Sequence, residues 1–417
     1  MTSVVFVAPY ALESTLRFVR ATAGLSGVRL GIVSQEPPEA VAAKFPAAER
    51  ERITECVRVG NALDADQLER AVVNVAQRLG GRVDTLLGIL EPLQEPLAIV
   101  RERLRIPGMD TVEARRFRDK SVMKETLRSH GLPCARHRLA STTREALDFA
   151  QQCLPLVAKP PAGAGSRDTF RVDQIEQLEQ WLAARPPSAA APLLLEEFIQ
   201  GEEFSFDSVT IGGEHRFHSI SSYAPTPLEV METPWIQWAV LLPREIDGPE
   251  FAPIREAGPA ALKALGMVTG MTHMEWFRRP DGSIAISEVA ARPPGAQFTS
   301  LISWAHDRDF YRAWAELSVL DAFDPPERRY AAGAAYLRGQ GAGAVESVEG
   351  LDQLRSELGE LVVEAKLPQP GQPKAESYEG EGYVILRHPE TAVVAEGLKR
   401  LVSTLHVRLG RGPSARS

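Results

Sequence analysis

The chain has 417 residues, of which 44% are hydrophobic and 24% are charged. These fractions are those of an ordinary globular protein, so a disordered, collagenous or coiled-coil architecture is excluded, and the length favours two to four domains. The 47 Lys and Arg residues against 55 Asp and Glu residues give a formal net charge of −8, which excludes a general basic surface for nucleic acid or anionic membrane.

The amino-terminal apolar run at residues 4–8 has no basic segment before it, so we interpret it as a buried strand and not as a signal peptide. No run of about 18 apolar residues predicts a membrane span. The three cysteines, Cys56, Cys134 and Cys153, form no C-x-x-C pair and are too few for a disulfide framework. We therefore expect a cytoplasmic protein that binds neither membrane nor nucleic acid.

The first 110 or so residues alternate short apolar runs with helical stretches. Strands are expected at 4–8, 30–34 and 84–90, and apolar residues at helical spacing predict a helix over 68–79. This alternation predicts an open parallel α/β sheet. The first strand is not followed by G-x-G-x-x-G, so we do not expect a dinucleotide site there.

The middle of the chain predicts helices and an antiparallel sheet. Helices are expected at 120–129 and 175–184, and strands at 154–159, 193–199 and 203–211. Further on, the sequence Pro-Asp-Gly at 280–282 joins the expected strands 271–278 and 283–290 in a hairpin. The polar, proline-rich stretch 324–330 is a predicted boundary, and a small α+β domain is expected beyond it.

Lys159 ends an expected strand and is followed by the small residues of 160–166. Small side chains let the backbone turn tightly and point N–H groups at an anion, and the lysine adds positive charge for a phosphate. No G-K-[ST] follows, so this is not a P-loop. A flexible surface loop is the alternative interpretation of the same residues.

The segment LEEFIQGEE at 195–203 is an apolar strand that ends among four carboxylates. One interpretation is that the backbone at Glu197 and Ile199 reads an adenine edge while Glu203 accepts hydrogen bonds from ribose hydroxyls. The alternative, to which we give equal weight, is a solvated end of a strand.

The hairpin carries three polar side chains on one face. Pairing the strands about the turn places His273 opposite Glu288 and Glu275 opposite Ile286, and residue parity then puts His273, Glu275 and Glu288 on the same side.

Neighbouring carboxylates repel each other unless a cation lies between them, and Mg²⁺ is the cation that suits both carboxylate and nucleotide phosphate. Arg292 follows Glu288 by four residues and is expected to reach the same centre, where it would neutralise a transferred phosphoryl group. The alternative is a surface cluster of Glu275 and Glu288 neutralised by Arg278 and Arg279, but the flanking residues are apolar and favour burial.

Taken together, these segments resemble the ATP-grasp superfamily. The motifs that carry the resemblance are RDKSVMKETLRSHGLP, which contains Lys120, then VAKPPAGAGS, EEFIQGEE, and THMEWF followed by SEVAARPPG. Their order and spacing fit over about residues 1–330. The form E-x-x-A-R-P-x-G after H-x-E is most similar to the L-amino-acid ligase branch.

The resemblance implies an α/β and α+β multidomain fold of ATP-grasp architecture. The implied domains are an open parallel α/β domain at 1–115, a lid lobe with the phosphate loop at 116–202, a catalytic lobe with the metal-binding hairpin at 203–327, and a small C-terminal α+β domain at 328–417.

The resemblance also implies a role for each matching residue. ATP would be contacted by Lys120, Lys159, Gly163, Gly165, Ser166, Glu196, Glu197, Phe198, Ile199 and Glu203. Glu275 and Glu288 would hold Mg²⁺, or Mn²⁺ in its place, while Lys159 and Arg292 would act on the transferred phosphoryl group. The chain departs from the family at Ala290, where the usual pattern E-x-N-x-R has an asparagine.

The implied reaction is ATP-dependent joining of a carboxylate and an amine, with amino acids as the expected substrates, an acyl phosphate as intermediate, and ADP and phosphate as products. His273 is a candidate catalytic base, and a structural histidine bonded to Glu288 is an equal alternative. Two rivals are a carboxylating or purine-pathway type of ATP-grasp enzyme, and a catalytically silent nucleotide-binding module. A homodimer is the default expectation.

Two features beyond the motifs bear on the substrate. The aromatic residues Tyr223, Trp235 and Trp238 precede the hairpin and either line a pocket or pack in the core. Arg338 either binds a substrate carboxylate or is an exposed arginine in a turn.

Overall fold

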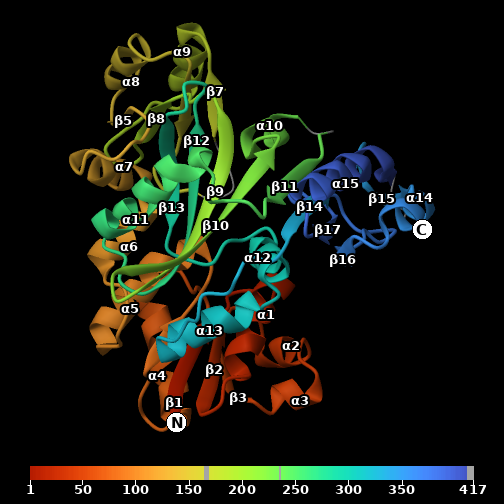
Figure 1. Cartoon of the computed structure of the whole chain (residues 1–417). Helices are drawn as coiled ribbons and strands as arrows, with labels where there is room; N and C mark the ends of the chain where they lie inside the picture. The colour runs from red at the N-terminus through yellow and green to blue at the C-terminus, as the bar shows by residue number, and fades with distance from the viewer. Residues whose placement is uncertain (164–168, 234–235, 411–417) are drawn as a thin grey trace, which may run out of the picture.

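The computed structural model describes residues 1–163, 169–233 and 236–410 (Figure 1). The predicted residues Gly165 and Ser166 of the phosphate loop, and Trp235, lie outside this range. The described residues form a mixed α/β structure with one parallel sheet and three antiparallel ones. None of the described helices is long and apolar enough to cross a membrane.

The N-terminal sheet is parallel, with strand order β3-β2-β1-β4. Its strands are β1 (Thr2–Val7), β2 (Val28–Ser34), β3 (Ile53–Arg58) and β4 (Thr85–Leu87). The helices around it are α1 (Glu13–Ala23), α2 (Pro38–Ala42), α3 (Ala47–Arg50), α4 (Ala65–Arg78), η1 (Glu91–Leu93) and α5 (Gln94–Leu104). The predicted open parallel sheet is confirmed. The edge strand β3 was not predicted, because its charged and half-buried residues give no apolar run.

A small antiparallel sheet of order β5-β8-β6-β7 lies at the opposite end of the molecule, at the top of Figure 1. Its elements are α6 (Thr111–Arg118), α7 (Lys120–Ser129), β5 (His137–Ala140), α8 (Thr143–Ala150), β6 (Leu156–Lys159), β7 (Phe170–Val172), α9 (Ile175–Ala184) and β8 (Leu193–Glu197). The apolar faces of α8 and α9 pack on it through Ala146, Ala150, Leu178 and Leu182.

The large sheet has strand order β13-β12-β9-β10-β11-β14-β17-β16, with every neighbouring pair antiparallel. Its first part consists of β9 (Glu202–Ile211), β10 (Glu214–Ala224), α10 (Pro227–Glu232), β11 (Trp238–Leu242), η2 (Pro249–Phe251), α11 (Ala252–Leu265), β12 (Gly270–Arg278) and β13 (Ile284–Ala290). One face is apolar and packs against α11 through Phe206, Met274 and Trp276. The opposite face carries the polar side chains described below.

The C-terminal strands extend the same sheet, since Trp238 of β11 pairs with Tyr336 of β14. The remaining elements are α12 (Phe298–His306), α13 (Phe310–Leu320), β14 (Ala331–Leu337), β15 (Ala344–Glu349), α14 (Leu351–Leu358), β16 (Val362–Lys366), β17 (Gly382–His388), α15 (Thr391–Thr404) and β18 (His406–Gly410). Only β15 and β18 form a separate pair. The predicted domain boundaries remain predictions, but the sheet is continuous across residue 327.

Candidate active site

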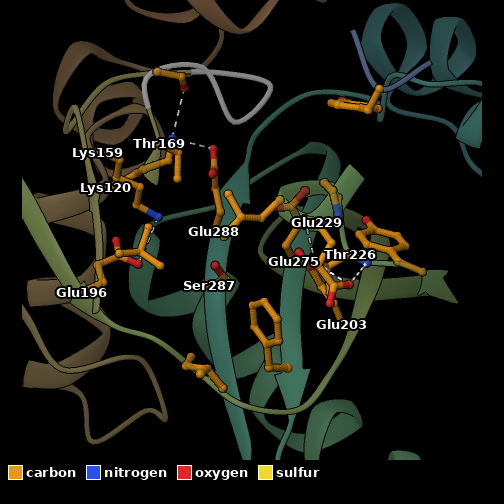
Figure 2. Close-up of a pocket in the computed structure, with 18 of the residues that line it drawn as sticks. Lys120, Lys159, Thr169, Glu196, Glu203, Thr226, Glu229, Glu275, Ser287 and Glu288 are labelled. Carbon is orange, nitrogen blue, oxygen red and sulfur yellow. Dashed lines mark hydrogen bonds and ion pairs between the residues drawn. The ribbon is translucent and has the colours of Figure 1, made fainter. Parts of the chain in front are cut away.

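A cavity of about 450 Å³ lies between the small sheet and the polar face of the large sheet. Every predicted site residue that the structure describes lines it, namely Lys120, Lys159, Gly163, Glu196, Glu197, Phe198, Ile199, Glu203, His273, Glu275, Glu288 and Arg292. Figure 2 shows two sides to this cavity, with Lys120, Lys159 and Glu196 on one side and Glu203, Glu229 and Glu275 on the other. Segments far apart in the sequence therefore meet where the motifs predicted.

The predicted register of the metal hairpin is wrong. Trp276 pairs with Ile286, and Glu275 pairs directly with Glu288, because the turn is one residue longer than expected and Ser287 is the extra residue of a bulge. Without this bulge, Glu288 would pair with Met274 and face the apolar side of the sheet. The prediction that His273, Glu275 and Glu288 share one face is nevertheless confirmed, since all three line the cavity.

Glu275 and Glu288 form the candidate metal site. Directly paired residues on neighbouring antiparallel strands have Cβ atoms about 5 Å apart, which lets two carboxylates converge on one cation. The described residues hold no cluster of three or more His, Cys, Asp or Glu side chains arranged for a metal, and Ala290, which also lines the cavity, offers no ligand. This donor set fits Mg²⁺, which keeps several waters and takes its other ligands from substrate phosphates.

Glu288 is paired with Lys120 in this structure, since Nζ lies 2.9 Å from Oε1. Burial by itself raises the pKa of this carboxyl, but the nearby charges of Lys120 and Lys159 outweigh it and lower the pKa to about 2. Glu288 is therefore ionised at neutral pH. Its carboxylate becomes available to a cation when the Lys120 ammonium group moves to another partner.

The two predicted phosphate lysines come from different elements. Lys120 is the first residue of α7, where the Asp119 carboxylate caps the helix by accepting from the N–H groups of Ser121 and Val122. Its Nζ also donates to the carbonyl of Gly163, at 3.1 Å. Lys159 ends β6, and its Nζ lies 3.0 Å from Oε2 of Glu196.

Lys124 belongs to this site and was missed by the sequence analysis. It is fully buried, donates to the Ser287 carbonyl at 2.6 Å, and lies 3.4 Å from Glu196. It follows Lys120 by one helical turn. A lysine within the apolar stripe of a helix is the sequence feature that could have identified it. The bulge that orients Glu288 is thus anchored by a side chain from α7.

Glu196 lines the cavity, its Oε1 has no hydrogen-bond partner among the described residues, and its role as an ATP contact stays a prediction. Its carboxylate lies between Lys124 and Lys159, and although burial raises the pKa of this carboxyl, the two lysines bring it below its usual value. Glu196 therefore holds the two lysines in place.

The segment predicted to bind adenine has one backbone N–H free and two engaged. The Glu197 N–H donates to the Arg136 carbonyl at 2.9 Å and the Phe198 N–H to the Pro155 carbonyl at 3.0 Å. The Ile199 N–H has no hydrogen-bond partner among the described residues, and Ile199 lines the same cavity. The Ile199 position thus fits the predicted reading of a base edge, and the role of the Glu197 backbone stays a prediction.

The arginines proposed as neutralisers of the hairpin are occupied elsewhere. Arg279 lies 2.9 Å from Glu197 and Arg278 lies 2.6 Å from Glu202. The alternative of a surface cluster in which Arg278 and Arg279 neutralise Glu275 and Glu288 is therefore wrong.

Glu203 is the predicted ribose contact. It is 7% exposed and lines the cavity, and its carboxyl group has no hydrogen bond or ion pair within the described parts of the chain. Burial, together with the charge of Glu275, raises the pKa of this carboxyl well above its usual value. An unpartnered buried carboxyl that faces a cavity requires a hydrogen-bonding ligand, and a pair of hydroxyl groups fits that requirement.

His273 is held by Asp207, a residue that the sequence analysis did not single out. The His273 Nδ1 lies 2.6 Å from Asp207 Oδ1, and Nε2 lies 3.7 Å from Glu275 Oε1. Burial lowers the pKa of the imidazole, but Asp207 and Glu275 raise it overall to about 9. The structural partner of the ring is Asp207 and not Glu288, and the role of His273 as a catalytic base stays a prediction.

Arg292 is fixed by a residue from the N-terminal region. Its Nε lies 2.6 Å from Oε2 of Glu91 in η1, and its Nη1 donates to the Pro293 carbonyl. Glu91 is 6% exposed. No sequence pattern connected these two residues, which lie 201 positions apart.

Aromatic side chains form the rest of the wall. Tyr223 and Trp238 both line the cavity and are buried, so both interpretations given for them hold. Trp238 stacks on Tyr336 with ring centroids 4.5 Å apart and contacts Tyr378 edge-on at 4.8 Å. Tyr378, which lies between β16 and β17, brings the C-terminal region to the cavity.

A small antiparallel sheet that faces a large one across a cavity with clustered lysines and paired carboxylates is the ATP-grasp architecture. The crystal structure of an L-amino acid ligase from Bacillus licheniformis matches 99% of this chain and 99% of its own, with a TM-score of 0.78 and 19% identity. A carboxyaminoimidazole ribonucleotide synthase from Aspergillus clavatus, solved with ATP, matches 97% of this chain and 98% of its own, with a TM-score of 0.71 and 18% identity. The fold is thereby confirmed.

Sequence relatives with known names match about half of the chain. An L-arginine-specific L-amino acid ligase of Bacillus subtilis is 26% identical over 220 residues, which cover 51% of this chain and 52% of that protein. An alanine–anticapsin ligase of Bacillus subtilis is 25% identical over 256 residues, covering 56% and 53%. The chain thus spans about half the length of these curated relatives. No family profile matches it.

Proposed function

We propose that this chain is an ATP-dependent carboxylate–amine ligase that joins amino acids through an amide bond and releases ADP and phosphate. The observation that carries the proposal is the direct pairing of Glu275 with Glu288 in a cavity that Lys120, Lys159 and Arg292 also line. The names of the relatives, two of which are amino-acid ligases, support the substrate class.

The cavity residues divide into those that hold the nucleotide and those that hold the metal. Phe198 and Ile199 enclose the base, Glu203 accepts from the ribose, and Lys120 and Lys159 neutralise the phosphates. Glu275 and Glu288 would hold Mg²⁺, which supplies charge neutralisation on the phosphate oxygens when bound. On nucleotide binding, Lys120 would exchange the Glu288 carboxylate for a phosphate, which would leave that carboxylate free to hold the cation.

The reaction then needs mainly positioning and charge neutralisation. An oxygen of the substrate carboxylate attacks the γ-phosphorus, the bond to ADP breaks, and an acyl phosphate forms. The amine attacks the acyl carbon, phosphate leaves, and the amine loses a proton to water. Arg292, which Glu91 holds at Nε, faces the cavity and offsets negative charge on the transferred group.

The test is a phosphate-release assay over a matrix of L-amino-acid pairs, with mass spectrometry of the products. We expect phosphate release that depends on both amino acids, an amide product, and loss of both signals in Glu288→Gln. Bicarbonate with an amine is the parallel arm for a carboxylating enzyme. Absence of any amide across the matrix contradicts the ligase proposal, and nucleotide binding without turnover would favour a silent binding module.

A further inference from the structure

One wall of the cavity is the short helix α10 and the residue before it. Thr226, Leu228, Glu229 and Glu232 line the cavity, and Figure 2 shows Thr226 and Glu229 beside Glu203 and Glu275. The helix begins with a capping box, in which the Thr226 hydroxyl accepts from the Glu229 N–H and the Glu229 carboxylate accepts from the Thr226 N–H. A helix of six residues is too short to be stable alone, so contacts from outside must hold it.

Arg338, which directly follows β14, makes those contacts at the other end of α10. Its Nη1 donates to the carbonyl of Val230 at 2.8 Å, of Ile236 at 2.9 Å and of Thr233 at 3.2 Å. The last carbonyls of a helix have no N–H partner within the helix, and a positive charge there is favourable. A single guanidinium nitrogen therefore contacts the carbonyl of Val230 in the last turn of α10 and those of Thr233 and Ile236 after it.

A second contact ties the same two segments together. The Arg338 N–H donates to Oε1 of Gln237 at 2.7 Å, and Nε2 of Gln237 donates back to the Arg338 carbonyl at 2.9 Å. The side-chain and backbone groups of Arg338 thus both act at the C-terminal end of α10. Arg338 does not line the cavity, so the earlier interpretation of a substrate-carboxylate ligand is not supported.

We propose that Arg338 is a positioning residue that fixes α10 against the nucleotide side of the cavity, beside Glu203. The C-terminal region thereby sets nucleotide affinity without touching the nucleotide. The inference rests on the proposed function only in taking the cavity to bind ATP, and it does not depend on which acid or amine is used.

The experiment compares Arg338→Met, which keeps the aliphatic stem but removes every donor, with Arg338→Lys, whose ammonium has three N–H donors for the three carbonyls. ATP binding is measured by calorimetry, and KM for ATP and kcat are measured separately. We expect Arg338→Met to weaken ATP binding and raise KM about tenfold, or about 1.4 kcal/mol, with kcat within about twofold. Arg338→Lys should recover most of the affinity, and the exposed Arg408→Met should match the parent protein.

An unchanged ATP affinity in Arg338→Met, or a fall in kcat with KM unchanged, overturns the proposal. If Arg338→Met does not fold, Gln237→Ala decides the matter, because it removes the second contact alone. It should weaken ATP binding about threefold, and unchanged binding contradicts the inference. Failure of the parent protein to form any amide while it still binds ATP would defeat the ligase proposal and leave this one standing.

Discussion

Glu91 and Arg292 form an ion pair of 2.6 Å that joins the N-terminal α/β region to the end of the metal hairpin. Arg292 follows Glu288 by four residues, and Glu91 is buried in η1 at the edge of the parallel sheet. Because the pair uses Nε of the guanidinium, it fixes the direction in which the rest of the group faces the cavity. The N-terminal region is thus part of the candidate active site and not only a scaffold beside it.

We expect Glu91→Gln to lower kcat about 10- to 100-fold while ATP binding changes little, because the guanidinium loses its charged partner but keeps its place in the chain. Steady-state kinetics and calorimetry check this. Glu95→Gln, one turn along in α5, is the matched control and should behave as the parent. An unaltered kcat in Glu91→Gln would show that the pair serves stability alone.

Replacing either carboxylate of the hairpin should weaken the binding of Mg²⁺. We expect Glu275→Gln and Glu288→Gln each to raise the Mg²⁺ concentration for half-maximal phosphate release at least about 100-fold, since two paired carboxylates are the protein's candidate ligands. Titration of Mg²⁺ at saturating ATP is the measurement. Glu202→Gln, whose side chain is 70% exposed and pairs with Arg278, is the control. Parent-like Mg²⁺ dependence in both variants would place the metal elsewhere.

Lys124→Met should destabilise the protein. The substitution leaves the Ser287 carbonyl without its donor and Glu196 with Lys159 as its remaining partner. Removing one member of a buried charged group is expected to lower the free energy of unfolding by about 3 kcal/mol, the lower end of the usual range because Lys159 stays. Urea denaturation measures the change, and the exposed Lys399→Met should show almost none. A loss below about 0.5 kcal/mol would mean that the bulge does not depend on Lys124.

Stability should fall in mild acid. Burial lowers the pKa of His218 and of His306 to about 4 each, whereas an unfolded histidine titrates near 6.5. Between pH 6.5 and 4 the unfolded chain therefore binds protons that the folded chain does not. The contribution of each neutral histidine to the free energy of unfolding is thus complete above pH 6.5. It is lost as the pH falls toward 4, and the loss is on the order of 3 kcal/mol for each group.

Urea denaturation between pH 4 and 7 tests this expectation in the parent and in His306→Asn. The free energy of unfolding of the variant should depend less steeply on pH than that of the parent. The difference in slope should correspond to the uptake of about one proton fewer on unfolding, because one titrating group is gone. The exposed His130→Asn should keep the parent slope. Equal slopes in His306→Asn and the parent would show that His306 is not held neutral.

The local pattern of the chain was sufficient to predict its architecture. Strand and helix periodicity determined the parallel N-terminal sheet, and the order of the motifs determined which residues meet in the cavity. Parity along a single strand also placed His273 and Glu275 on one face, because side chains alternate with a period of two. These features depend on residues close together in sequence or on short motifs.

Features decided by distant partners were not predictable. The register of the hairpin depends on the bulge at Ser287, whose carbonyl binds Lys124 from α7. The orientation of the His273 ring depends on its hydrogen bond with Asp207 of β9.

The sequence by itself therefore determined the fold class and the candidate ligands, since short-range sterics, periodicity and the order of the motifs encode these. Only the tertiary structure decided how those groups are paired and charged. Buried charges and hydrogen bonds take their partners from whichever segments packing brings close, as Glu91 and Arg292 illustrate.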